Sequence, residues 1–340
     1  MRKKIVVSAI TILAILNSLV IVLIKCNEPQ NSPVIPQIIL VYAENQVEDY
    51  PTTKGAYEFA RLVSEKTNGR IKIVVKCNGE LGDEKSIIEQ LKFGGIDFSR
   101  VSISSISDDI PELKVIQMPF LYSDAQEMWD VLNGDDGKQF IDAVGKSNLG
   151  VRTLSWYDAG ARSFYSVKPV TTIQDLYSLN LRVQESELMS ETVELLGANP
   201  VKMIYSEVYK GLKTRKIDGA ENSLVSYIYS KHYEQAKYCI LDEHTRIPEV
   251  QLVSEYTWNK LTEEDRAVIS ECAKESAIYE RYIWKDTEEE AVRTIEDKDI
   301  TVIEVSEEER RDLREKLQPI YDRYCLDYMD IIEKIEKNQE

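Results

Sequence analysis

The chain has 340 residues, 43% of them hydrophobic, which is enough to bury a core and, by length, to form about two domains. It carries 42 Lys and Arg against 59 Asp and Glu, a net charge of −17. This acidity excludes nucleic acid as a partner, because such a surface repels phosphates. An anionic ligand therefore requires a local cluster of Arg to overcome the general field.

The N-terminus has the pattern of a targeting segment. MRKK precedes the apolar run IVVSAITILAILNSLVIVLI, and Lys25 and Cys26 follow it. This pattern is typical of a secretory signal, and the position of Cys26 indicates a bacterial lipoprotein that carries lipid on this thiol. Lys25 departs from that pattern, and the length of the run also allows an uncleaved spanning anchor. Both alternatives place the folded part outside the cytoplasmic membrane, with 1–26 as signal or anchor and the Pro-rich 27–37 as a tether.

Strands and helices alternate in the first half of the folded part. Apolar runs predict strands at 37–44, 70–77 and 96–104, and helical spacing of apolar residues predicts helices at 52–69 and 82–95. This order predicts parallel pairing with right-handed crossovers. Ligands of such sheets bind beyond the carboxyl ends of the strands, which points to 44–49 and 100–104.

The second half repeats this alternation. Strand 177–184 is followed by helix 185–197, an extended stretch, and a short helix that we expect Ser206 to cap. One helix of about 30 residues, roughly 45 Å long, is predicted after Thr262, which forms an approximate capping box with Asp265. The tail, 306–337, is predicted to be helical with a break near Pro319.

These patterns predict two α/β units with a ligand cleft between them. Apart from Cys26, four cysteines are scattered along the chain without metal-ligand spacing, so thiols of the core or surface are expected and a disulfide stays open. No metal site and no cofactor motif is predicted. These cysteines are Cys77, Cys239, Cys272 and Cys325.

Four segments in order resemble the solute-binding proteins of TRAP (tripartite ATP-independent periplasmic) transporters. They are GELGDEKSIIEQLKFGGIDF, IQMPFLYSD, GARSFYSVKPVTTIQDLYSLNLRVQES and LLGANPVKMIYSEVYKGLKTRKIDGAEN. The resemblance covers about residues 38–330. Further segments, among them SWYDAGARSFY and DEHTRIPEVQL, are similar to the branch that binds hexuronates such as glucuronate and galacturonate.

The resemblance implies a periplasmic-binding-protein-like α/β fold of two domains with a hinge and a long helix that spans both. Domain I is expected at 38–159 plus 248–287 and domain II at 160–247 plus 288–335. It further implies a monomeric, extracytoplasmic protein, held at the membrane only by its N-terminus. This protein closes on an acidic sugar and delivers it to the permease subunits.

The resemblance assigns the main carboxylate-binding role to Arg182, a second site arginine to Arg162, and a site amide to Asn222. A guanidinium suits this role because its planar fork meets a carboxylate with two parallel hydrogen bonds. The amide of Asn222 both donates and accepts, which suits a sugar hydroxyl. Two structural alternatives stay open: Arg182 as the partner of Glu185 or Glu187, and Arg162 in an interdomain salt bridge.

Further candidates lie beside these arginines or on the loops of domain I, where they could recognise the sugar end of the ligand. These are Asp158, Gln184, Glu185, Arg100, Ser102, Glu44, Gln46 and Asp49. For His244 and Arg246, packing at the hinge is expected. Ser178 stands where the family usually has Gly, which concerns a turn.

Other ligands and two other classes of protein remain as alternatives, an enzyme and a sensor ectodomain or partner-presenting subunit of the same fold. The same fold could bind a C4-dicarboxylate, an aldonate or sialic acid. An enzyme acting on uronates lacks its usual signals here, because the chain has only two His and no nucleophile motif, phosphate loop or metal cluster. We therefore expect a binding protein and not an enzyme.

Overall fold

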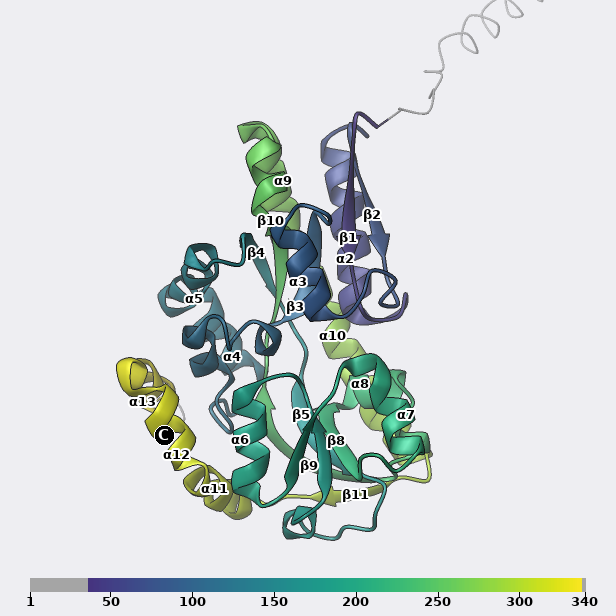
Figure 1. Cartoon of the computed structure of the whole chain (residues 1–340), viewed down its shortest axis with the longest axis vertical. Coiled ribbons are helices and arrows are strands. Elements are labelled where there is room, and N and C mark those ends of the chain that lie inside the picture. Colours follow the sequence, from purple (N-terminus) through teal and green to yellow (C-terminus); the bar gives the residue numbers. More distant parts are fainter. Residues whose placement is uncertain (1–35, 338–340) are drawn as a thin grey trace, which may run out of the picture.

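The structure is a computed structural model that describes residues 36–337. The predicted signal or anchor segment, Cys26 and most of the predicted tether lie outside these residues. Within 36–337, no helix is long and apolar enough to cross a membrane. The described chain folds into two lobes, each built around one β-sheet (Figure 1).

The first lobe, the upper one in Figure 1, contains a five-stranded sheet. β1 pairs in parallel with β2 and with β3, as the alternating pattern predicts, and β10 enters antiparallel between β3 and β4. In spatial order the strands are β2 (Ile71–Lys76), β1 (Ile38–Ala43), β3 (Phe98–Ser102), β10 (Glu249–Ser254) and β4 (Val151–Tyr157).

Two helices connect the parallel strands of this lobe. α2 (Pro51–Lys66) begins with Pro at its first position, where no backbone donor is lost, and it buries Phe59 and Val63 against the sheet. α3 (Glu84–Lys92) is capped by Asp83, whose side chain accepts a hydrogen bond from the Ser86 amide at 2.9 Å. The remaining helices between β3 and β4, and after β10, are α4 (Ala125–Asn133), α5 (Asp135–Lys146) and α9 (Glu255–Lys260).

The second lobe contains a six-stranded sheet of mixed direction. β5 runs antiparallel to both β8 and β9, whereas β6 runs parallel to β7 and β8. Its helices are α6 (Glu187–Leu196), α7 (Val208–Lys213) and α8 (Leu224–Tyr229). In spatial order the strands are β11 (Thr301–Glu304), β9 (Tyr238–Arg246), β5 (Ala161–Ser166), β8 (Gly219–Ser223), β6 (Asn180–Val183) and β7 (Asn199–Lys202).

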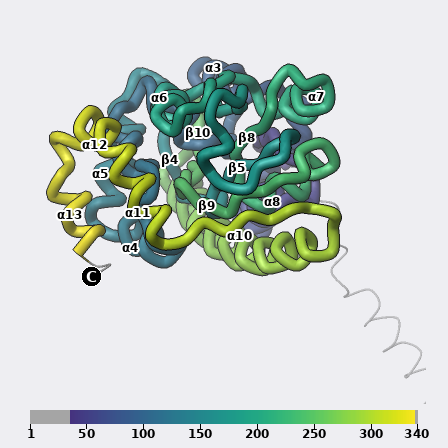
Figure 2. The backbone as a smooth tube through the Cα atoms, turned by 90° about the horizontal axis from the view of Figure 1, so that it is seen from below, coloured from purple at the N-terminus to yellow at the C-terminus, as the bar shows by residue number. Residues whose placement is uncertain are grey.

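The long helix α10 (Glu263–Asp297) braces both lobes along one side of the molecule (Figure 2). Its 35 residues span about 52 Å at 1.5 Å per residue. It contacts α2 and β4 of the first lobe and α8 of the second. The predicted cap is confirmed, because the Thr262 side chain accepts a hydrogen bond from the Asp265 amide.

The C-terminal helices also touch both lobes. Arg323 pairs with Glu191 on α6 of the second lobe, whereas Lys334 pairs with Asp136 on α5. The predicted interruption near Pro319 is confirmed, since one helix ends at Lys316 and the next begins at Gln318. These helices are α11 (Glu307–Lys316), α12 (Gln318–Tyr324) and α13 (Met329–Lys337).

The largest apolar cluster is continuous between the lobes, joining Val101 of β3 to Phe164 of β5 and Leu181 of β6. The four cysteines of the described chain are buried free thiols, which agrees with the expected thiols and not with the alternative of a disulfide.

One local prediction is wrong. A 3-10 turn precedes α7, so Ser206 lies inside this turn and does not cap the helix. The 3-10 turns are η1 (Ile103–Ser105), η2 (Pro111–Gln117), η3 (Ile173–Leu176), η4 (Tyr205–Glu207), η5 (His232–Glu234) and η6 (Leu326–Tyr328).

Candidate ligand-binding site

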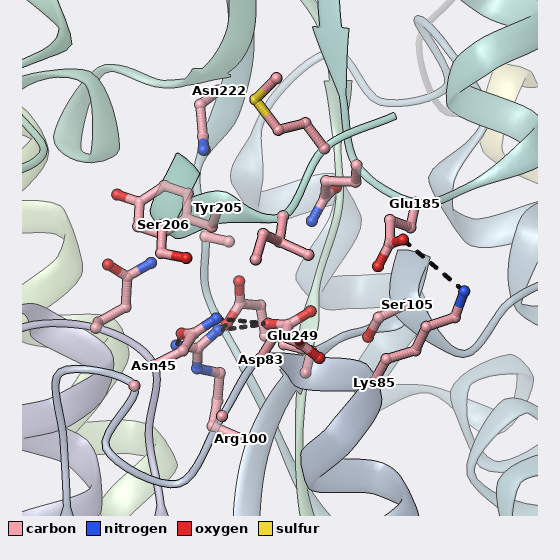
Figure 3. A pocket seen from close by; sticks show the side chains of 18 of the residues that line it. Asn45, Asp83, Lys85, Arg100, Ser105, Glu185, Tyr205, Ser206, Asn222 and Glu249 are labelled. Atoms are coloured by element: carbon pink, nitrogen blue, oxygen red, sulfur yellow. Dashed lines mark hydrogen bonds and ion pairs between the residues drawn. The ribbon is translucent and has the colours of Figure 1, made fainter. Parts of the chain in front are cut away.

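A cavity of about 370 Å³ lies between the two lobes. The first lobe contributes the loops after β1 and β2, the start of α3, and side chains of β3 and β10. The second lobe contributes side chains of β5, β6 and β8 and the segment 203–206 (Figure 3). The volume is in the range of small-molecule sites, and the position agrees with the predicted cleft.

Arg182 lies on β6 and lines this cavity although only 4% of it is exposed. Its Nε donates to the backbone oxygen of Met203 at 2.9 Å. No Asp or Glu of residues 36–337 forms an ion pair with it. Burial lowers the pKa of Arg182, because desolvation disfavours the charged guanidinium; the charge of Glu221 opposes this effect, and nearby Arg162 adds to it. The site thus holds a desolvated cation whose remaining donors have no anionic partner within the described chain.

The two acidic neighbours that the sequence offered as partners of Arg182 are engaged elsewhere. Glu185 lies 4.0 Å from Lys85 of the first lobe, and Glu187 lies 2.6 Å from Lys202. The structural alternative for Arg182, a pair with one of these glutamates, is therefore wrong.

Arg162, in contrast, is paired within its own lobe. Its Nε and Nη2 donate to the two carboxylate oxygens of Glu221 at 2.5 and 2.9 Å. Burial alone would raise the pKa of Glu221, but Arg162 and His244 outweigh burial and lower it to about 2. Since β5 and β8 are neighbours in the second sheet, the alternative of an interdomain bridge is wrong for this pair.

Asn222 links this pair to the cavity. Its Oδ1 accepts hydrogen bonds from Arg162 Nη1 at 3.1 Å and from the Ser223 amide at 2.8 Å. With the oxygen satisfied, the Nδ2 group is the end that faces the cavity (Figure 3). Asn222 thus offers donors to a ligand, next to the guanidinium of Arg182.

Arg100 lies on β3 in the wall of the first lobe and is 1% exposed. Its Nε and Nη2 donate to Glu44, Nη2 also donates to Asn45, and Nη1 donates to Glu84 at 3.2 Å. Glu249 Oε2 lies 2.6 Å from Nη1, but the angle gives no hydrogen bond. Three carboxylates therefore surround one guanidinium, and Arg100 is no free receptor for a ligand anion.

Burial changes the charge of this acidic group. It raises the pKa of Glu249 to about 8, although Arg100 lowers it, because neighbouring Glu84 and Glu44 add to the effect of burial. Burial also raises the pKa of Glu84. Burial and the neighbouring acids therefore favour the protonated forms of Glu249 and Glu84 more than in free carboxyl groups.

Three further predicted residues line the cavity: Gln46 on the loop after β1, and Gln184 and Glu185 after β6. Gln184 Oε1 is buried and accepts no hydrogen bond from the described residues. Glu185 faces Lys85 across the gap between the lobes (Figure 3). Gln184 is thus an acceptor without a donor inside the cavity.

Four predicted residues do not line this cavity. Asp49 is exposed on its loop. Glu44 lies behind the wall, where it binds Arg100, and the Ser102 amide donates to Glu84. Asp158 accepts hydrogen bonds from Trp129 Nε1 and from the amides of 159 and 160, where the chain passes between the lobes. Contact of these four with a ligand stays a prediction.

The cavity also contains residues that sequence reasoning did not select. Glu84 lies near the start of the helix predicted at 82–95, a position that gives no hint that its side chain faces a cleft. Glu249 begins a strand that is far from β3 in sequence. The other polar residues are Asn45, Tyr50, Asn78, Asp83, Lys85, Ser105, Tyr205 and Ser206.

The site has the chemistry of recognition. Within 36–337, no group of three or more His, Cys, Asp and Glu side chains is placed to hold a metal ion. The unpaired guanidinium of Arg182, amide groups, hydroxyls and the carboxyl groups of Glu84 and Glu249 surround the space. Such a set orients a small polar anion by hydrogen bonds.

Comparisons with known proteins agree with this reading. The family model of DctP, bacterial extracellular solute-binding protein family 7, matches residues 42–327. A solute-binding protein from Chromohalobacter salexigens is 36% identical over 283 residues, which cover 83% of each chain.

Solved structures of TRAP periplasmic solute-binding proteins share the fold. The protein from Xanthobacter autotrophicus Py2, with bound beta-D-galacturonate, has 35% identity and a TM-score of 0.83 over 88% of this chain and 99% of its own. The protein from Pseudomonas putida F1, with bound D-glucuronate, has 29% identity and a TM-score of 0.85 over 88% and 97%. These proteins bind solutes for transport and are not enzymes. The chain belongs to the bacterial extracellular solute-binding proteins of family 7, the solute-binding components of TRAP transporters.

Proposed function

We propose that this protein captures a hexuronate, such as glucuronate or galacturonate, outside the cytoplasmic membrane. The observation that carries the proposal is the buried guanidinium of Arg182, which lines the cavity and has no acidic partner among the described residues. A ligand carboxylate completes this pair with two charge-assisted hydrogen bonds. Asn222 and Gln184 then bind hydroxyl groups from the same lobe.

The bound ligands of similar proteins support the sugar acid. Structures with 35% and 29% identity contain beta-D-galacturonate and D-glucuronate. The same family also binds other acids, since a 28% identical relative from Bacillus subtilis is a C4-dicarboxylate-binding protein. A C4-dicarboxylate, an aldonate and sialic acid are therefore the alternative ligands.

Binding is proposed to close the two lobes on the ligand. The predicted domains, 38–159 plus 248–287 and 160–247 plus 288–335, are supported by the division of the strands between two sheets. Two polar contacts beside the cavity join the lobes: Lys85 faces Glu185, and the Glu187 amide donates to Asp108 at 3.2 Å. A ligand that touches both lobes adds the contacts that favour the closed form.

The closed, loaded protein is proposed to deliver its ligand to TRAP permease subunits as a monomer. The N-terminal segment, with Cys26 as the lipid-bearing residue or as part of an uncleaved anchor, keeps the protein at the outer face of the membrane. This tethering raises the local concentration of the binding protein near the permease.

Calorimetry on the purified protein tests the proposed function. Glucuronate and galacturonate are expected to bind with micromolar affinity or better, whereas their uncharged parent sugars are not expected to bind measurably. Solution scattering with and without ligand is expected to show a smaller radius of gyration in the complex. Tight binding of succinate or malate, with no binding of either uronate, would replace the hexuronate by a C4-dicarboxylate.

A further inference from the structure

The walls of the cavity differ in charge. The second lobe presents the unpaired Arg182, whereas the first lobe presents Glu84 and Glu249 around Arg100. We propose that Glu84 and Glu249 are specificity-determining residues that admit the hydroxyl-bearing end of the ligand and reject a second carboxylate. The proposal rests on the proposed function, in which Arg182 holds the first carboxylate.

The hydrogen bonds of Arg100 explain why the part of this wall around Arg100 offers no free donor to an anion. Glu44 accepts hydrogen bonds from Nε and Nη2 of Arg100, Asn45 also accepts one from Nη2, and Glu84 accepts one from Nη1. The fourth contact, with Glu249, occupies the remaining space beside Nη1. A carboxylate arriving here would meet acids in front of a guanidinium whose donors are already engaged.

The same groups suit a hydroxyl. The charged groups that face Glu249 are Arg100, Glu84 and Glu44 of the first lobe, with Arg162 of the second. Burial, with Glu84 and Glu44, raises the pKa of Glu249 to about 8, which favours the protonated form of its carboxyl group near neutral pH. A protonated carboxyl both donates and accepts, as a sugar hydroxyl does, so the two can exchange a pair of hydrogen bonds.

The unpartnered acceptor on the opposite wall points to the same ligand chemistry. Gln184 Oε1 is buried without a donor among the described residues. Buried acceptors of this kind require donors, and a carboxylate has none to give. Hydroxyl groups supply these donors, which makes the ligand a polyhydroxy monocarboxylate.

A matched ligand pair tests the proposal. Galactonate and galactarate are open chains with the same hydroxyl stereochemistry, and galactarate differs only in a second carboxylate in place of the terminal hydroxymethyl group. Calorimetry on the wild type at pH 7 is expected to show galactonate binding about 100-fold more tightly, since like charges at a buried contact cost several kcal/mol. Equal affinities, or no binding of galactonate by a protein that binds galacturonate, would overturn the proposal and leave the proposed function intact. Failure of both galacturonate and galactonate to bind would instead overturn the proposed function, and the inference with it.

Variants and pH assign the effect to the two glutamates. Glu84→Gln is expected to reduce the preference for the monocarboxylate over galactarate at least tenfold at pH 7. In the wild type the preference should widen from pH 7 to pH 9, as Glu249 ionises, and Glu249→Gln should remove this pH dependence. Glu187→Gln, at an exposed acid outside the cavity, is the control. It should change neither the preference at pH 7 nor its dependence on pH. A preference that is unchanged in Glu84→Gln and in Glu249→Gln would overturn the proposal. Because the comparison between two ligands needs only the wild type, it holds even if a variant folds poorly.

Discussion

Arg162 and Glu221 form a two-point ion pair inside the second sheet, whereas Arg182, on the next strand beyond Glu221, has no acidic partner in the described chain. The two arginines are 3% and 4% exposed, so solvent does not distinguish them. What differs is the countercharge. The charge of Arg162 is paired with Glu221 in the fold, whereas the charge of Arg182 is expected to be paired with a ligand. This difference separates their expected effects on stability and on binding.

Arg162→Met is expected to destabilise the ligand-free protein by about 3–5 kcal/mol, because it leaves Glu221 charged and buried without its main partner. Urea unfolding monitored by fluorescence measures this change. Arg152→Met is the matched control, since Arg152 pairs with Glu255 at the surface and such pairs contribute about 1 kcal/mol or less. Equal stability of the Arg162 variant and the wild type would show that the pair is not needed for folding.

Arg182→Lys is expected to behave in the opposite way. Lys keeps the charge but loses the planar fork, so binding of galacturonate or glucuronate should weaken more than tenfold. The melting temperature of the ligand-free protein should stay nearly unchanged, because no ion pair within the described residues is broken. Calorimetry checks the loss of affinity, and thermal unfolding checks that the melting temperature of the ligand-free protein is unchanged. A large loss of stability without ligand would assign Arg182 a structural role.

The positions of these arginines could be predicted from the sequence, because each belongs to a short strand in a recognisable segment. The acidic surroundings of Arg100 could not. Glu249 meets Arg100 only because β10 inserts antiparallel between β3 and β4, and this pairing joins parts of the chain that are distant in sequence. Similarly, Ser206 has the residue type of a helix cap, but the 3-10 turn places it on the cavity wall instead.

The raised pKa of His244 is expected to make the stability of the protein depend on pH. Its Nδ1 lies 2.9 Å from Asp242 Oδ2 and its Nε2 lies 3.7 Å from Glu221 Oε2. Burial alone would lower the pKa of His244, but these carboxylates outweigh burial and raise it to about 9. Because the folded pKa exceeds the unfolded value of about 6.5, the stabilisation is complete below pH 6.5 and is lost as pH rises through 9. The loss is on the order of 3 kcal/mol.

Urea unfolding between pH 6 and pH 9.5 checks this trend. Glu249, whose pKa of about 8 is also above its unfolded value, adds to the loss of stability between about pH 4.5 and pH 8. Glu249→Gln should therefore flatten the lower part of the profile and leave the part that His244 causes. A free energy of unfolding that rises with pH across this window would contradict the assignment of the proton to His244.

Cys26 separates the two alternatives for the N-terminus. If the segment is a lipoprotein signal, cells that express the full chain should incorporate labelled palmitate into the wild type and not into Cys26→Ala. The variant should then be released from the membrane fraction or remain unprocessed. Cys77→Ala, at one of the buried free thiols, is the control and should retain the label. Membrane retention of an unlabelled wild type would favour the uncleaved anchor.

Ser178 has a left-handed backbone conformation, with φ of 62°, in the turn before β6. Its amide donates to the oxygen of Gly197 at 2.8 Å, and its side chain is exposed. Gly adopts this conformation without the steric cost that a Cβ atom adds, so Ser178→Gly should stabilise the protein by about 0.5–1 kcal/mol. Urea unfolding measures the change. Tyr177→Gly is the control, because at its φ of −53° Gly relieves no strain, adds freedom to the unfolded chain and removes the ring beside Gly197, so this replacement should destabilise. A loss of stability in Ser178→Gly would mean that the left-handed conformation carries no strain.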